Sequence, residues 1–210
     1  MKVKGGTKTL SKTLIIDTAT KHIYLSLVVD RIEQQSVYRE GINNHSVTII
    51  PLLDEMLNKQ NMSLQDLDEI IVGIGPGSYT GVRIGVTVAK MIGYLNKIKV
   101  YSVSSLALIA SASNKEYIIP YIDARRGNAF IAAMKQSEGK LKFIKEEHLE
   151  NIESFLSQFD FEYDFITEGK PNINKILASD LLTEVKNIHE LIPNYLRITE
   201  AERNKSGSIN

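Results

Sequence analysis

The chain has 210 residues, with 25 basic and 25 acidic side chains, 43% hydrophobic residues and no cysteine. The balanced charge argues against a protein that binds nucleic acid over its whole surface, and the missing cysteine excludes disulfides, thiolate metal sites and cysteine nucleophiles. No apolar run approaches the ~18 residues that a membrane span needs, so we expect a packed, cytoplasmic protein.

The first predicted elements follow a basic start, residues 1–12, which we expect to be a flexible extension. Three segments then have the composition of strands: TLIID is continuous and apolar, IYLSLVV alternates, and EQQSVYRE is more polar. They lie close enough in sequence to form a meander. The next segment, HSVTIIPLLDEMLNKQ, predicts a helix in which Leu53, Met56 and Leu57 share one face.

A glycine-rich stretch, GIGPGSYTGVRIGVTVAK, follows a buried strand at 70–72 and leads into a helix that reaches about Leu95. It fails as a dinucleotide-binding fingerprint, because Ser78 takes the third glycine place and no acidic residue stands about 20 positions further on. It also fails as a P-loop, because no lysine begins the helix. Two interpretations stay open. Gly75, Gly77 and Ser78 either form a degenerate phosphate loop at the helix start or provide a sharp exit from the strand.

Small residues recur every four positions along this predicted helix, at Gly81, Gly85, Ala89 and Gly93. A glycine inside a helix costs up to ~1 kcal/mol relative to alanine, so close packing must compensate for this stripe. The stripe is expected to pack either on the protein's own sheet or on a helix of a partner.

A strand, IKVYSV, and a helix, SSLALIASAS, are predicted to complete a first lobe over residues 13–112. A second start follows in YIIPYIDARRGNAF, which predicts two strands joined by a turn at Arg126 and Gly127. We assign the second lobe to residues 113–200 and a flexible tail to residues 201–210. The chain is thus predicted to hold two α/β halves.

Each half has an aspartate at the end of its first strand, Asp17 in IIDTAT and Asp123 in YIDARRG. Two-lobed nucleotide-binding folds of the actin and Hsp70 type place a glycine two positions after such an aspartate, where it lets phosphate approach the backbone. Ala19 and Arg125 take those places here. We therefore interpret both aspartates as structural or vestigial residues.

The four histidines, at positions 22, 45, 148 and 189, have no partners at metal-ligand spacing. Ser78 lacks a base that the sequence reveals, and no nucleophile elbow is present. We accordingly expect no catalytic residue, no cofactor and no metal.

The glycine stretch resembles the hallmark of the TsaB (YeaZ) family, whose members take part in the synthesis of threonylcarbamoyladenosine in bacterial tRNA. LIIDTAT, HSVTIIPLLDEML, YIDARRGNAF and PNYLR agree with that family in order and spacing. The resemblance implies an α/β protein with the two-lobe actin- and Hsp70-like (ASKHA) fold, in which duplicated mixed sheets carry flanking helices. The second lobe is short here, and the nucleotide site is degenerate.

The resemblance also implies a non-catalytic scaffold or dimerisation subunit that binds and activates TsaD, the catalytic threonylcarbamoyltransferase. The ATPase TsaE is expected in a larger complex, and tRNA is expected to touch this chain at most indirectly. The metal-binding His-x-x-x-His of the paralogue does not carry over, because Gly41 and Ile49 stand four positions from His45.

Two helices are predicted to form the face that binds TsaD, and the same face would serve a homodimer. Its expected residues are Leu53, Met56, Leu57, Gly81, Gly85, Ala89 and Gly93. The alternative function is an enzyme of the same fold that binds and hydrolyses a nucleotide by itself, through Asp17 and the loop at Gly75 and Gly77.

Overall fold

The structure is a computed structural model that describes residues 11–41 and 45–196. The predicted tail at 201–210, and all of the predicted extension except its last two residues, lie outside the described residues. Lys12 already belongs to the first sheet, where it pairs with Val29. Among the described residues, no helix is long and apolar enough to cross a membrane.

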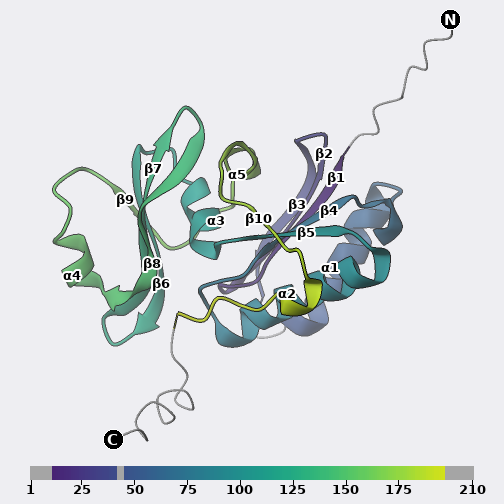
Figure 1. The fold of residues 1–210 in the computed structure, drawn as a ribbon, viewed down its shortest axis with the longest axis horizontal. Helices are drawn as coiled ribbons and strands as arrows, with labels where there is room; N and C mark the ends of the chain where they lie inside the picture. The colour runs from purple at the N-terminus through teal and green to yellow at the C-terminus, as the bar shows by residue number, and fades with distance from the viewer. Residues whose placement is uncertain (1–10, 42–44, 197–210) are drawn as a thin grey trace, which may run out of the picture.

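Two mixed sheets with flanking helices make up the molecule (Figure 1). The first half contains β1 (Lys12–Asp17), β2 (His22–Val29), β3 (Ile32–Glu40), α1 (His45–Lys59), η1 (Leu64–Asp66), β4 (Glu69–Gly73), α2 (Tyr79–Asn96), β5 (Lys99–Val103) and α3 (Ser105–Ser111). The second contains β6 (Tyr117–Arg125), β7 (Asn128–Ser137), β8 (Lys140–Asn151), α4 (Ile152–Leu156), β9 (Asp164–Ile166), α5 (Ile173–Ala178), β10 (Thr183–Glu184) and η2 (Ile188–Glu190).

The six-stranded first sheet has the order β10-β5-β4-β1-β2-β3, and the four-stranded second sheet has the order β8-β7-β6-β9. The predicted meander is confirmed, because β1 pairs antiparallel with β2 and β2 pairs antiparallel with β3. The two-lobe α/β prediction is confirmed as well. Two helices of the second half are short: α4 ends at Leu156, and α5 ends at Ala178 before the chain turns into β10.

Alternation along β1 explains how helices come to cover both faces of the first sheet. Leu14 and Ile16 pack in a core cluster with α1 and α2, whereas Ile15 packs in another with α3 and α5. Successive side chains of a strand point to opposite faces, so a continuous apolar strand requires cover on both sides. Figure 1 accordingly shows α1 and α2 below the first sheet, with α3 and α5 between the two sheets.

The last described residues return to the first lobe and form a segment that we call the C-terminal strap, residues 183–196. It begins with β10, which pairs with β5 and covers that edge of the sheet. Further along, Asn194 donates its amide hydrogen to the Ile74 carbonyl at 2.7 Å. The predicted second lobe at 113–200 is therefore not one block in space, because the strap at 183–196 packs on the first lobe.

Candidate functional site

The loop between β4 and α2 is closed against the end of β1. The Ser78 amide donates to the Ala19 carbonyl at 2.7 Å. A Cβ placed on Gly77 would lie 2.3 Å from that same carbonyl oxygen, so only glycine permits this approach. Gly77 thus allows the loop to pack against the residues that follow β1. The Ser78 amide is already hydrogen-bonded within the protein and is not available to a phosphate.

Asp17 lies behind this loop and is nearly fully buried. Its Oδ1 accepts hydrogen bonds from the Ala19 amide at 2.8 Å and from the Ser105 hydroxyl at 3.2 Å. The Ser105 hydroxyl in turn accepts from the Gly75 amide at 3.0 Å. Burial raises the pKa of Asp17 from 3.8 to about 6, against the smaller lowering by these hydrogen bonds. The carboxylate therefore connects the end of β1 to α3 and, through Ser105, to the glycine-rich loop, which is a structural role.

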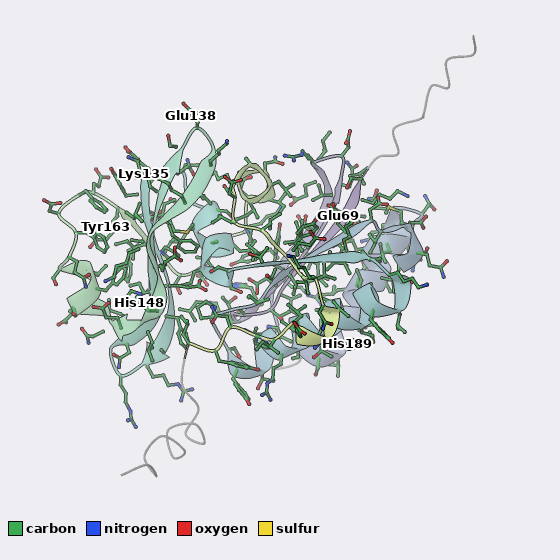
Figure 2. The ribbon with its side chains drawn as sticks, in the orientation of Figure 1. Glu69, Lys135, Glu138, His148, Tyr163 and His189 are labelled. Carbon is green, nitrogen blue, oxygen red and sulfur yellow. The ribbon has the colours of Figure 1, made fainter. Side chains whose placement is uncertain are left out.

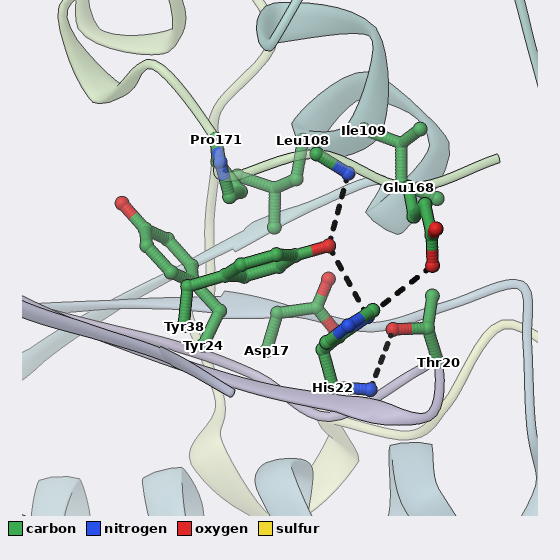
Figure 3. A pocket seen from close by; sticks show the side chains of 10 residues that line it. Asp17, Thr20, His22, Tyr24, Tyr38, Leu108, Ile109, Glu168 and Pro171 are labelled. Carbon is green, nitrogen blue, oxygen red and sulfur yellow. Dashed lines mark hydrogen bonds and ion pairs between the residues drawn. The ribbon is translucent and has the colours of Figure 1, made fainter. Parts of the chain in front are cut away.

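A cavity of only about 20 Å³ remains beside Asp17 (Figure 3). Tyr38 closes it: its hydroxyl accepts from the Gly169 amide at 2.9 Å and hydrogen-bonds His22 Nδ1 at 3.1 Å. Glu168 lies 4.0 Å from the same ring nitrogen. This space holds at most one water molecule, so a nucleotide has no room next to Asp17.

A much larger groove, of about 1710 Å³, adjoins this cavity and runs between the lobes. Gly77 and Ser78 line it from the first lobe, and Asp123, Arg125 and Arg126 line it from the second. Asp123 is exposed, and its Oδ1 accepts from the Arg125 amide at 2.8 Å. The structure thus brings Ser78 and Asp123 to one groove, whereas Asp17 lines the small cavity next to it.

The small-residue stripe of α2 packs on this protein's own sheet, which is one of the two alternatives that the sequence left open. Thr18 Oγ1 donates to the Gly81 carbonyl at 2.7 Å and accepts from the Gly85 amide at 3.0 Å. A Cβ on Gly93 would lie 2.6 Å from a methyl carbon of Val100 on β5. Ala89 is fully buried.

The residues predicted for a partner face therefore need correction. All seven are buried in the first lobe: Leu53, Met56, Leu57, Gly81, Gly85, Ala89 and Gly93. The physical reason is that an apolar or small stripe indicates close packing without naming the surface that it packs on. The two helices carry other side chains on their opposite side.

That opposite side exposes large apolar groups, and we call it the outer helix face. It consists of Val47, Ile50, Met91, Tyr94 and Leu95, all exposed. Val47 and Ile50 lie in the first half of α1, and Met91, Tyr94 and Leu95 lie in the last turns of α2. Large exposed apolar residues on neighbouring helices are typical of an interaction surface. Sequence reasoning missed these residues because they flank the stronger buried stripes, although α1 is apolar nearly all round in its first half.

The strap adds contacts that the sequence did not predict. Glu147 on β8 accepts from Asn194 Nδ2 at 2.6 Å and from the hydroxyl of Ser104, which caps α3. Burial raises the pKa of Glu147 above its usual value, which its two hydrogen bonds only partly offset. This carboxyl thus ties the second sheet to both the first lobe and the strap.

No group of three potential metal ligands occurs within 11–41 and 45–196. His45 begins α1, and its ring lies against Gly41, whereas Ile49 belongs to the apolar core. Figure 2 shows His148 in the second lobe and His189 beside α2, far from each other.

The family model for TsaD, tRNA N6-adenosine threonylcarbamoyltransferase, matches residues 30–193. The tRNA threonylcarbamoyladenosine biosynthesis protein TsaB of Bacillus subtilis is 31% identical over 224 residues, which cover 90% of this chain and 95% of that protein. TsaB of Escherichia coli is 29% identical over 60% of this chain and 56% of its own length. YeaZ from Pseudomonas aeruginosa matches with a TM-score of 0.74 at 20% identity, over 89% of this chain and all of that one, and shares its fold.

Proposed function

The chain belongs to the TsaB (YeaZ) family of tRNA threonylcarbamoyladenosine biosynthesis proteins, and from that premise we propose that it is a non-catalytic subunit, which binds and activates the catalytic subunit TsaD. The observation that carries this proposal is the closed loop between β4 and α2. The Ser78 amide donates a hydrogen bond to the Ala19 carbonyl, and the Asp17 carboxylate accepts hydrogen bonds from the Ala19 amide and the Ser105 hydroxyl. A nucleotide-hydrolysing site needs such groups to be free for phosphate and water.

The metal-binding part of the catalytic paralogue has no counterpart that would work here. The positions four residues from His45 are Gly41 and Ile49, and the Ile49 side chain lies in the core formed with β1 and β2. Replacing Ile49 by a ligand would bury a polar group, which costs free energy unless it is paired. This absence of donors fits a subunit that supports catalysis elsewhere.

The outer helix face is the surface that we assign to TsaD. Burying apolar side chains at a contact contributes roughly 25 cal/mol for each Å² removed from water, and the centre of an interface is usually depleted of charge. The corrected face keeps the predicted pair of helices but replaces the buried stripe by Val47, Ile50, Met91, Tyr94 and Leu95. The same face would allow two copies of this chain to pair in the absence of TsaD.

Ile50→Asp tests this assignment, with Ile144→Asp as its matched control. Ile50 is 43% exposed on α1, and Ile144 is 42% exposed on β8, away from the outer helix face. We expect Ile50→Asp to lose capture of TsaD, because a charge in an apolar interface must be desolvated. Ile144→Asp should capture TsaD normally. Equal capture by Ile50→Asp and wild type, with both variants folded, would contradict the assignment.

A further inference from the structure

The turn between β6 and β7 forms one wall of the large groove, and it carries two adjacent arginines in an unusual backbone conformation. Arg125 has φ 71° and Arg126 has φ 57°, both in the left-handed region. Arg125 pairs with Asn128, so Arg126 and Gly127 form the two-residue loop of the hairpin. Such loops favour asparagine, aspartate or glycine, because other residues are strained there. The choice of arginine therefore indicates a use for its side chain.

The guanidinium groups of both arginines are uncommitted within the described part of the chain. No ion pair of the described residues involves either of them. Asp123, their nearest acidic neighbour in sequence, accepts from the backbone amide of Arg125. Lys21, the remaining lysine or arginine that lines the groove, is already paired with Glu168 at 3.0 Å and with Glu40 at 3.6 Å. The available positive charge of the groove thus sits on the hairpin.

The first-lobe rim of the same groove offers aromatic rings. Tyr79 and Tyr195 are both exposed, their ring centroids are 5.2 Å apart, and both line the groove. Arg83 lies 3.9 Å from the Tyr79 ring centroid and donates to the Tyr195 hydroxyl at 2.6 Å. These contacts hold the two rings in place while leaving part of their surface open to solvent.

We propose that this groove binds a single-stranded segment of RNA, with phosphates at Arg125 and Arg126 and a base stacked on the Tyr79–Tyr195 pair. Guanidinium groups for phosphates and aromatic rings for bases are the two contacts by which proteins hold unpaired RNA. The inference rests on the proposed function in taking the RNA to be the tRNA that the assembly modifies. It replaces the expectation that tRNA touches this chain at most indirectly.

The size and the closed loop favour RNA over a mononucleotide as the occupant. Pockets for small molecules measure roughly 300–1,000 Å³, and this groove holds about 1710 Å³. The loop amide that a mononucleotide would need, that of Ser78, is bound to Ala19. An extended strand can instead span the distance between the two lobes and contact both walls.

The test is fluorescence anisotropy of the full chain with a labelled anticodon stem-loop RNA from a tRNA that reads codons beginning with A, over a series of salt concentrations. The variant Arg125→Asn/Arg126→Asn removes both cations, and asparagine tolerates the left-handed conformation, so the hairpin keeps its shape. We expect affinity to fall roughly tenfold or more, and the slope of log K against log salt to fall by about 2, one for each phosphate contact.

Lys140→Asn/Lys142→Asn removes the same charge from exposed positions of β8 and serves as the matched control, which should bind like wild type. Tyr79→Ala should weaken binding without changing the salt slope, because it removes stacking alone. Equal binding by the arginine variant and wild type overturns the inference. So does an equal loss in the lysine control, absence of binding by wild type, or displacement of the RNA by ATP with magnesium or by polyglutamate.

Failure of this inference can be told from failure of the proposed function. RNA binding is measured on this chain alone, whereas the proposed function depends on capture of TsaD through Ile50. If RNA does not bind and capture remains sensitive to Ile50→Asp, the inference falls and the partner role stands. If RNA binds and capture of TsaD is insensitive to Ile50→Asp, the inference about RNA stands and the assigned partner surface falls.

Discussion

The amide of Gly85 donates a hydrogen bond to Thr18 Oγ1 at 3.0 Å, and a Cβ on Gly85 would lie 2.6 Å from that oxygen. The same hydroxyl donates to the Gly81 carbonyl, so one threonine at the end of β1 fastens two consecutive turns of α2 to the sheet. Close approach of helix and strand thus explains why the sequence accepts glycines inside a helix. The surface that we propose for docking lies on the opposite side of the helix.

Gly85→Ala should lower the free energy of unfolding by about 1–3 kcal/mol, the usual cost of overpacking, partly offset by up to ~1 kcal/mol of helix propensity. For a chain of this length each 1 kcal/mol corresponds to about 2–4 °C in Tm. Thr87→Ala, at an exposed position of the same helix, should melt like wild type. A normal Tm for Gly85→Ala would mean that the contact with Thr18 is looser than described.

Much of the fold follows from local pattern, and the site follows less well. The meander of β1, β2 and β3, the glycine turn and the two α/β halves are all visible in periodicity and turn residues, because these features are local. The strap is not, since β10 has two residues and its pairing with β5 joins Thr183 to Ser102 across the chain. The direction of the α2 stripe was also undecided, because it depends on Thr18, which is 67 positions from Gly85.

The candidate site shows the same division between local and distant information. The substitution of glycine by Ala19 and Arg125 predicted that the phosphate loop is degenerate. That Ser78 is bound to Ala19, and Asp17 to Ser105, requires contacts between distant segments. The sequence predicted a turn at Arg126 and Gly127, but the left-handed conformation of Arg126 follows from the strand pairing that makes it a two-residue hairpin loop.

Asp17→Asn should stabilise the protein at neutral pH and leave the modification reaction intact when the partner proteins are supplied. The folded-state pKa of Asp17, about 6, lies above its unfolded value of 3.8, so the folded state holds the proton more tightly. The contribution of Asp17 to the free energy of unfolding is therefore fully present below pH ~4. It is lost as the pH rises through ~6, and the loss is at most about 3 kcal/mol.

Thermal melting between pH 4 and pH 7 checks this expectation. The wild type should lose Tm with rising pH over that window more steeply than Asp17→Asn does, because the variant lacks the titrating group. A variant that melts lower than wild type at pH 7 would contradict the raised pKa, and a folded variant that fails to support modification would contradict a purely structural Asp17.

The isolated chain should bind ATP with magnesium weakly and should not hydrolyse it. The Ser78 amide is used by Ala19, the cavity beside Asp17 holds about 20 Å³, and no triad of metal ligands exists within the described ranges. Isothermal calorimetry with a phosphate-release assay measures both properties. Sub-micromolar binding accompanied by turnover would instead favour an enzyme that acts by itself.

Glu147→Ala should weaken the connection between the second sheet, α3 and the strap. It leaves the Asn194 amide without its acceptor in a partly buried place and removes one bond of Ser104, which costs about 1–3 kcal/mol, or several degrees in Tm for a chain of this length. Glu147→Gln should retain most of the wild-type Tm at neutral pH. The reason is that burial already favours the uncharged carboxyl, and a glutamine oxygen can still accept from Asn194.

Glu146→Ala, which removes an exposed neighbouring charge, is the control and should change Tm little. The three variants are compared by thermal melting and by capture of TsaD. Because Glu147 lies apart from the outer helix face, folded Glu147→Ala should still capture TsaD, and loss of capture at full folding would show that the strap itself takes part in the interface.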